Sequence, residues 1–110
     1  MMAIVEVSVV PLGTGGTSLS PYVAGAVEIL EASGLSYELT AMGTIIYGDL
    51  DRILETVRAM HESCFQKGVR RVLTQIKIDD RRDRASTPED KVRSVLEKTR
   101  RSPSRRTDAV

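Results

Sequence analysis

LSYELTAMGTIIYGDLD, residues 35–51, is the stretch of sequence that decides the fold. It places two β-rich runs in direct succession at the centre of the chain, residues 35–42 and Thr44–Gly48. Gly43 lies between them and predicts a tight hairpin turn. Asp49 follows as a residue that can cap a helix. The centre of the chain therefore predicts an antiparallel pair of strands that leads directly into a helix.

A strand and a helix are predicted before this hairpin. Residues 3–10 (AIVEVSVV) alternate between a fully apolar face and a mixed face, and Pro11 is expected to end this strand. A glycine-rich loop leads to Ser20, the expected N-cap, and to Pro21 at the first helical position. The helix is expected to end at Gly34. Its apolar stripe comprises Val23, Ala26, Val27 and Leu30.

A second helix and a fourth strand are predicted after the hairpin. The helix extends from Asp49 to Gly68, and residues 69–78 (VRRVLTQIKI) form the strand. On the strand, Val72, Thr74, Ile76 and Ile78 share one face and Arg71, Leu73, Gln75 and Lys77 the other. The apolar stripe of the helix comprises Leu50, Ile53, Leu54, Val57, Met60, Cys64 and Phe65.

The order strand, helix, strand, strand, helix, strand predicts an α+β, ferredoxin-like fold. Right-handed crossovers give a four-stranded antiparallel sheet of order 4-1-3-2 with both helices on one face. The other face of the sheet, called the open face here, is left for a ligand or a partner. We therefore expect the function to reside on this open face.

The C-terminal part of the chain differs in composition. Residues 79–86 (DDRRDRAS) form a charged connector, and Thr87 with Pro88 predicts the start of a further helix with a thin apolar edge. We interpret residues 1–98 as a single domain and residues 99–110 as a disordered basic tail.

Composition excludes several classes of protein. The chain has 110 residues and a net charge of +1, so no strong field directs it to nucleic acid or membranes. It has no predicted signal peptide or membrane span. The lone Cys64 excludes an internal disulfide and a CxxC site, and it indicates a cytoplasmic protein.

The open face is expected to combine polar and apolar side chains. Such a surface suits a contact between copies of the chain, and it also suits a pocket for a small, flat, polar-edged ligand. The two interpretations are compatible, because a pocket can form where two sheets meet. The polar set is Glu6, Ser8, Glu38, Thr40, Tyr47, Gln75 and Lys77, mixed with Ile4, Ile45 and Leu73.

Other chemistry-bearing features have simpler interpretations. The loop PLGTGGTS lacks nucleotide-binding spacing, and it is either a ligand-closing loop or a flexible connection. The only histidine, His61, is expected at the edge of the core, and Cys64 as an inert core residue. The run of residues 79–84 is expected to form solvated or intersubunit salt bridges. We therefore expect no metal and no cofactor.

Missing residues exclude three other functions that occur on this fold. RNA-binding versions stack bases on strand aromatic residues, whereas here the first strand has none and the third has only Tyr47. Acylphosphatase-type catalysis requires an asparagine, and copper-chaperone versions require a CxxC motif; the chain contains neither. The basic segment RRSPSRR in the tail is weak support for a nucleic-acid role.

Three segments, VEVSVVPLGTGGTSLSPYV, YELTAMGTIIYGDLD and VLTQIKIDDRR, resemble the YkoF-like small thiamine-binding protein family in order and spacing. The resemblance covers about residues 2–98. It implies a ferredoxin-like fold, a homotetramer built as a dimer of dimers, and no catalysis. It also implies binding of thiamine or its hydroxymethylpyrimidine moiety in a pocket near subunit contacts.

One position departs from the pattern that this resemblance implies. Tyr47 follows Gly-Thr-Ile-Ile where an acidic residue is expected, and a phenol brings no charge to a thiazolium. Glu6 can supply the carboxylate instead. Ser8, Thr17, Ser18 and Gln75 are expected to offer hydrogen bonds, Met42 and Thr44 to border the pocket, and Tyr47 to stack or hydrogen-bond.

The sequence thus predicts a cytoplasmic homo-oligomer that binds a small molecule without transforming it. The alternative is a structural or regulatory oligomerisation module with no small-molecule ligand. An enzyme is disfavoured, because the single histidine and the scattered carboxylates do not suggest one cleft.

Overall fold

The computed structural model describes residues 2–84 and 87–99. The predicted tail from residue 100 onwards lies outside the described residues. The described residues form two units, one up to Asp80 and one from Arg81. Each unit is described by itself.

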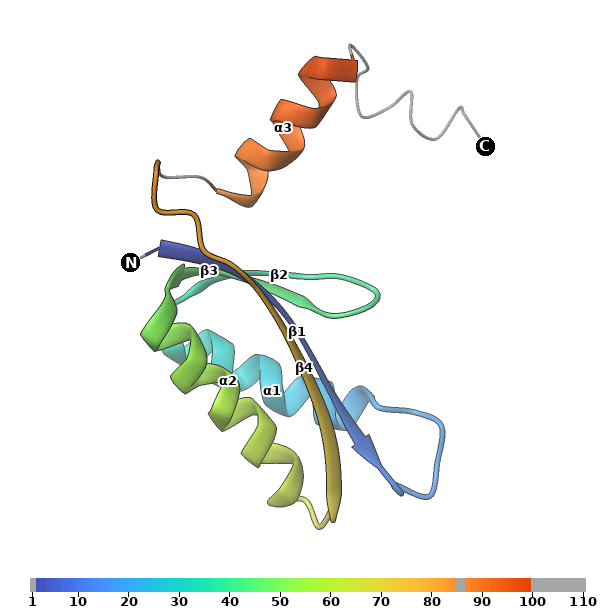
Figure 1. Ribbon diagram of the computed structural model, residues 1–110. Helices are drawn as coiled ribbons and strands as arrows, with labels where there is room; N and C mark the ends of the chain where they lie inside the picture. Colours follow the sequence, from blue (N-terminus) through green and yellow to red (C-terminus); the bar gives the residue numbers. More distant parts are fainter. Residues whose placement is uncertain (1, 85–86, 100–110) are drawn as a thin grey trace. The chain divides into compact units, whose positions relative to one another are not determined.

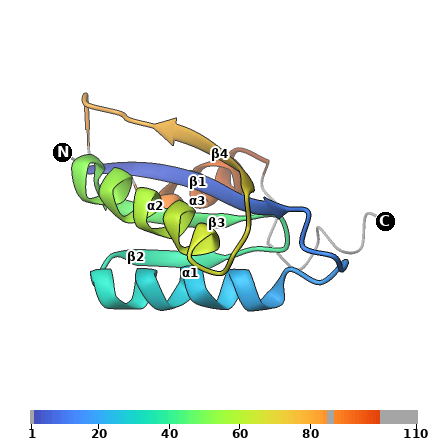
Figure 2. The same cartoon turned by 90° about the horizontal axis from the view of Figure 1, so that it is seen from below.

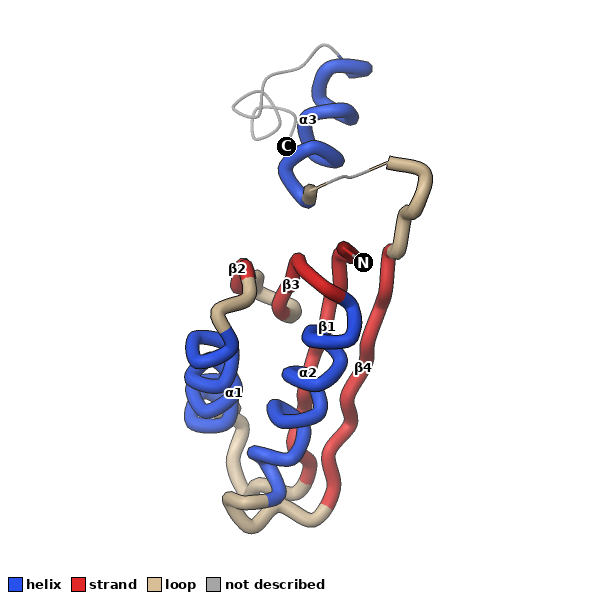
Figure 3. The backbone as a smooth tube through the Cα atoms, turned by 90° about the vertical axis from the view of Figure 1, so that its left-hand side faces the viewer, coloured by secondary structure: helices blue, strands red, loops and turns tan. Residues whose placement is uncertain are grey.

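The first unit is a four-stranded antiparallel sheet with two helices on one face (Figures 1 and 2). Its strand order is β2-β3-β1-β4, which confirms the order 4-1-3-2 and the ferredoxin-like topology predicted from sequence. The tube in Figure 3 shows α1 and α2 next to each other on the same side of the strands. The elements are β1 (Met2–Leu12), α1 (Ser20–Ser33), β2 (Ser36–Leu39), β3 (Thr44–Asp49), α2 (Leu50–Phe65) and β4 (Arg71–Asp79).

The core lies between the helices and the inner face of the sheet. Val5 and Val7 of β1 and Ile46 of β3 are at most 1% exposed, and they pack with residues from both helices. This confirms the predicted alternation of β1, because odd-numbered residues face the helices and even-numbered residues do not. Burying such side chains supplies most of the favourable free energy of folding, roughly 1.5–3 kcal/mol each. The helix residues of the core are Ala26, Leu30, Ile53, Val57 and Met60.

The strand ends differ from the sequence prediction. Pro11 does not end β1; it is buried within the strand, at the position opposite Val72 of β4. Beyond Val7, β1 pairs with β4 and with no second strand. Proline has no backbone N–H to donate, and it is tolerated where a strand has a free edge because no neighbouring strand on that edge requires this donor. β2 ends at Leu39 instead of residue 42, because Thr40 closes the hairpin.

The helix ends also differ in part. Ser20 is not the N-cap of α1: Leu19 occupies that position and its carbonyl accepts hydrogen bonds from the amides of Tyr22 and Val23. Asp49 caps α2 as predicted, since its carboxylate accepts a hydrogen bond from the Arg52 amide at 3.2 Å.

At the C-terminal ends of these helices, the structure again agrees with the prediction for one helix and differs from it for the other. Gly34, with a φ of 72°, ends α1 as predicted. By contrast, α2 ends at Phe65 and not at Gly68, which lies in the following turn with a φ of 89°.

The second unit contains α3 (Pro88–Thr99). Thr87 and Asp90 form a capping box, in which the amide of each residue donates to the side chain of the other. Hydrogen bonding of the Asp90 carboxylate with the Thr87 backbone amide, and then with the Thr87 side chain, lowers the pKa of the Asp90 carboxyl. The predicted apolar edge comprises Val92, Val95 and Leu96; Val92 and Val95 are 53% and 60% exposed, and Leu96 is partly buried. No helix among residues 2–84 and 87–99 has the length and apolar character needed to cross a bilayer.

Replacing a core leucine tests this packing. Leu30→Ala removes a side chain that is 0% exposed, and we expect it to lower the free energy of unfolding by about 2–5 kcal/mol. Leu54→Ala, the same change at a helix position 37% exposed, should cost about 1 kcal/mol or less. Urea unfolding followed by circular dichroism measures both, and equal losses would contradict the assignment of Leu30 to the core.

Candidate functional site

A cavity of about 320 Å³ lies where the β2–β3 turn, the middle of β1 and the first turns of α1 meet. We call it the hairpin cavity. It forms because β3 begins at Thr44, opposite Val7, while β1 continues for five more residues to Leu12. The cavity therefore reaches the unpaired edge of β1. Its lining residues are Val7, Ser8, Val9, Val10, Leu19, Tyr22, Val23, Ala26, Val27, Leu39, Thr40, Ala41, Met42, Gly43, Thr44 and Met60.

The hairpin turn that borders this cavity is held by one hydroxyl group. Thr40 Oγ1 donates to the Gly43 carbonyl at 2.8 Å and accepts from the amides of Met42 and Gly43. Thr40 thus belongs to the turn and does not project from the open face as the sequence suggested. Gly43 packs against β1 so closely that a Cβ atom there would lie 2.8 Å from the Val7 carbonyl oxygen.

The lining of the hairpin cavity is mainly apolar with a few hydroxyl groups. Ser8, Thr40 and Thr44 supply aliphatic hydroxyls, and Tyr22 supplies a half-buried aromatic ring. No carboxylate, lysine or arginine is among the lining residues. Apolar walls with a few convergent polar groups suit a small, uncharged, flat ring.

Lys67 positions the wall of this cavity from outside. Its ammonium group donates to the Pro21 carbonyl at 2.7 Å and lies 5.8 Å from the centre of the Tyr22 ring. Both contacts are to the first turn of α1, which has no side-chain cap of its own. Lys67 therefore orders the start of α1 where it lines the hairpin cavity.

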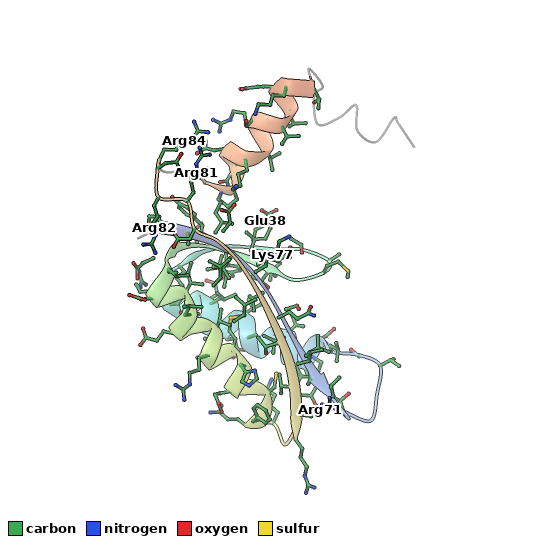
Figure 4. The ribbon with its side chains drawn as sticks, in the orientation of Figure 1. Glu38, Arg71, Lys77, Arg81, Arg82 and Arg84 are labelled. Carbon is green, nitrogen blue, oxygen red and sulfur yellow. The ribbon has the colours of Figure 1, made fainter. Side chains whose placement is uncertain are left out.

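A second cavity, of about 460 Å³, lies at the other end of the sheet. We call it the open-face cavity. The strand register places Glu38, Ile45, Glu6 and Lys77 in one row across the open face. Figure 4 shows Glu38 and Lys77 on the side of the sheet away from the helices. The lining residues are Ile4, Glu6, Ile45, Lys77, Ile78, Asp79 and Asp80.

The structure distributes the residues predicted from sequence over four places. Ser8, Met42 and Thr44 line the hairpin cavity, and Glu6 lines the open-face cavity. Tyr47 and Gln75 lie on the open face, Gln75 directly opposite Ser8, but they line neither cavity. Thr17 and Ser18 lie exposed in the loop before α1 and line neither cavity.

Sequence reasoning missed the contribution of α1 to the hairpin cavity. Leu19, Tyr22 and Val23 were not among the expected site residues, although Val23 belonged to the predicted apolar stripe. Val23 is 46% exposed, so the stripe of α1 is wider than the surface that the core covers. The sequence did carry one signal for this contribution: the apolar stripe of α1 is wider than the part of the helix that the core covers.

His61 and Cys64 lie apart from both cavities. His61 Nδ1 is 2.7 Å from the Thr74 hydroxyl, and the His61 ring packs edge-on against Phe65 with centroids 5.3 Å apart. The Cys64 thiol is 1% exposed, and desolvation by this burial raises its pKa. Among the described residues, no three histidine, cysteine, aspartate or glutamate side chains are grouped to hold a metal ion.

Comparisons with known proteins give a family match and several close relatives. The family model described as thiamine-binding protein matches residues 5–96. A UPF0045 protein of Methanothermobacter thermautotrophicus is 51% identical over 98 residues, which span 88% of this chain and 99% of that protein. The UPF0045 protein YqgV of Bacillus subtilis is 48% identical over 98 residues, 86% of this chain and 94% of that protein.

Solved structures of relatives share the fold. The crystal structure of a hypothetical protein from Methanocaldococcus jannaschii superimposes with a TM-score of 0.80 at 40% identity, covering 87% of this chain and 97% of that one. A domain of unknown function from Bacillus cereus gives a TM-score of 0.75 at 33% identity, covering 83% of this chain and 86% of that one.

The buried thiol gives a direct chemical test. Because Cys64 is buried and its pKa is raised, we expect the native protein at pH 8 to react with an aromatic disulfide reagent far more slowly than the unfolded protein. Absorbance of the released thiolate measures both rates. Rapid reaction of the native protein would show that Cys64 is accessible and reactive.

The hairpin turn gives a test of the cavity wall. Gly43→Ala brings a methyl group against the Val7 carbonyl, so the turn must shift, and we expect a loss of about 1–3 kcal/mol in the free energy of unfolding. Gly16→Ala is the matched control, because a Cβ atom there meets nothing within 4 Å. Thermal unfolding of the two variants should differ by several degrees, and equal midpoints would contradict the close approach.

Proposed function

The chain belongs to the thiamine-binding protein family, and from this premise we propose that it is a cytoplasmic, non-catalytic binding protein for thiamine or its hydroxymethylpyrimidine moiety. The observation that carries the proposal is the hairpin cavity. It has about 320 Å³ of space, apolar walls and neutral hydroxyl groups. An aminopyrimidine ring is flat, uncharged and polar at its edge, so this lining matches its chemistry.

The pyrimidine contacts proposed here come from β1 and the hairpin. Ser8 and Thr44 offer hydroxyl groups to the ring nitrogens and the amino group, while Met42 and Tyr22 border the ring. Met42 is 87% exposed, so its flexible side chain is available to cover a bound ring. Thr17 and Ser18, in the loop before α1, are proposed to close over the ligand.

The charged half of thiamine needs a different environment. Glu6 is two residues from Ser8 on the same face of β1, about 7 Å along the strand. A ligand whose pyrimidine occupies the hairpin cavity can therefore extend its thiazolium toward the Glu6 carboxylate. In this pose Gln75, opposite Ser8, and Tyr47, on the neighbouring strand β3, flank the ligand on the open face.

Binding without catalysis is supported by the state of the reactive side chains. His61 is engaged with Thr74, and Cys64 is buried with a raised pKa. Neither lines the hairpin cavity or the open-face cavity. A general base and a nucleophile in one cleft are what hydrolysis or group transfer would require.

Self-association through the open face is part of the proposal. Leu73 is 53% exposed there, and Ile4, Ile45 and Tyr47 are only partly covered within one chain. Covering such a mixed surface with a second copy would exclude water from the open-face cavity and place the ligand beside the subunit contact.

Calorimetric titration tests the ligand and its location together. Val23→Phe fills the hairpin cavity from an exposed position of α1, and we expect it to weaken binding of both hydroxymethylpyrimidine and thiamine at least about tenfold. Val95→Phe on α3, the same substitution at a position outside the cavity, should leave both affinities unchanged.

A variant of Glu6 tests the proposed role of its carboxylate. Glu6→Gln should weaken thiamine, which carries a positive charge, and spare uncharged hydroxymethylpyrimidine. If the wild-type protein binds neither compound at millimolar concentration, the ligand proposal fails. The open face would then favour the alternative, an oligomerisation module without a small-molecule ligand.

A further inference from the structure

Strand β1 has a free edge beside the hairpin cavity. β3 begins at Thr44, opposite Val7, whereas β1 continues to Leu12 alongside β4. Figure 1 shows β1 and β4 continuing together beyond the β2–β3 hairpin. A free strand edge presents backbone N–H and C=O groups that no neighbouring strand pairs. This edge adjoins the hairpin cavity, because Val9 is among the lining residues of the cavity.

The hydrogen bonding of the hairpin determines which residues of β1 face this free edge. The Thr40 amide donates to the Gly43 carbonyl at 2.8 Å, which makes these two residues a hydrogen-bonded pair. Such pairs alternate with non-hydrogen-bonded pairs along an antiparallel ladder, so Gly43 and every second residue after it bond to β2. Thr44 and every second residue after it bond to β1. Val7, opposite Thr44, therefore directs its amide and carbonyl toward β3.

The same alternation continues along β1 after β3 has ended. Residues two apart direct their backbone groups to the same side, so Val9 and Pro11 face the side on which β3 is missing. Ser8 and Val10 direct theirs toward β4. Pro11 has no amide hydrogen, so Val9 is the residue that presents both a donor and an acceptor to the free edge. Among residues 2–84 and 87–99, no backbone group of a turn or loop hydrogen-bonds to Val9.

A backbone amide and carbonyl on one side of an extended residue form an adjacent donor and acceptor. The complementary edge of a ligand is a ring nitrogen, which accepts, beside an exocyclic amine, which donates. A 4-aminopyrimidine has this edge, and side-chain amides recognise the same pattern on adenine by two hydrogen bonds. Val9 is partly buried and the hairpin cavity is mainly apolar, so water competes weakly for such bonds.

The hydroxyl groups of the cavity cannot supply this selectivity. The hydroxyls of Ser8 and Thr44 rotate, and each can donate or accept a hydrogen bond. They can therefore satisfy an amine or a carbonyl oxygen on the ligand equally well. The donor and acceptor of a strand backbone are fixed in direction, so only a ring with the complementary pattern pairs with both.

We propose that the backbone of Val9 determines the specificity of the hairpin cavity: its amide donates to a ring nitrogen of the ligand, and its carbonyl accepts from the adjacent amine. The ring takes the position beside β1 that β3 leaves empty, as an added strand would. Ser8 and Thr44 then serve the second ring nitrogen and the other amine hydrogen. This inference rests on the proposed function, and it defines the class of ring that the site accepts.

A ligand analogue tests the donor–acceptor pattern on the unaltered protein. The 4-oxo analogue of hydroxymethylpyrimidine has a ring N–H and a carbonyl oxygen at the two positions that face Val9. In the same orientation, donor meets donor and acceptor meets acceptor. We therefore expect calorimetric titration to give an affinity at least about tenfold weaker than for hydroxymethylpyrimidine. Equal affinities would contradict recognition by the backbone.

A proline substitution tests the amide itself. Val9→Pro removes the N–H, and the free edge should tolerate it as it tolerates Pro11. Val9→Ala is the matched control, because it also removes the valine side chain but retains the N–H. We expect Val9→Pro to bind hydroxymethylpyrimidine at least about tenfold more weakly than Val9→Ala does. Equal affinities of the two variants, with circular dichroism showing both folded, would overturn the inference.

Hydrogen exchange followed by NMR gives a test that does not depend on the folding of a variant. Without ligand, the Val9 amide of the wild-type protein should exchange rapidly, and saturating hydroxymethylpyrimidine should slow this exchange at least about tenfold. The Val7 amide, which bonds to β3, should exchange slowly in both states. An unchanged rate for Val9 would contradict the proposed hydrogen bond.

Failure of this inference is distinguishable from failure of the proposed function. If the wild-type protein binds hydroxymethylpyrimidine but Val9 is not protected from exchange, the ligand proposal stands and the role of the Val9 backbone is wrong. If the wild-type protein binds neither hydroxymethylpyrimidine nor thiamine, both are wrong.

Discussion

The unequal lengths of β1 and β3 determine the architecture of this protein. β1 has 11 residues and β3 has six, and the two are paired only as far as Val7 and Thr44. Beyond that point β1 is supported by β4 on one side and by the helices on one face. The space left beside it becomes the hairpin cavity, and the close contact between Gly43 and the Val7 carbonyl closes it at one end. A longer β3 would fill this space with a strand.

The parts of the fold that depend on local periodicity could be predicted from sequence. The alternation of β1 identified Val5 and Val7 as core residues, and Asp49 was identified as the cap of α2, because both signals involve residues close in the chain. The error at Pro11 has a different origin. Proline is excluded from a strand with two neighbours, and whether β1 has one or two neighbours there depends on where β3 begins. That is a tertiary property.

In the candidate site, too, some features follow from local periodicity and others depend on tertiary structure. Alternation correctly placed Glu6, Tyr47 and Gln75 on the open face. Thr44, expected only to border the pocket, lies in register with Val7 and therefore faces the helices. Of the eight residues predicted from sequence, three line the hairpin cavity and one lines the open-face cavity, and no periodic pattern reveals which residue lines which cavity. The contribution of Tyr22 to the hairpin cavity depends on how α1 crosses the sheet. The first turn of α1, which carries Tyr22, is ordered by Lys67, and this residue is 46 positions away in sequence from Pro21, whose carbonyl it contacts.

This long-range contact from Lys67 has a consequence for the order of folding. α2 carries its own cap and a regular apolar stripe, so it can form early from local interactions. The first turn of α1 has no side-chain cap, and it acquires its main polar contact only after α2 and the turn that follows it are in place. Lys67 should thus contribute after the rate-limiting step, so that replacing it accelerates unfolding more than it slows folding. The wall of the hairpin cavity is then among the last parts of the molecule to become ordered.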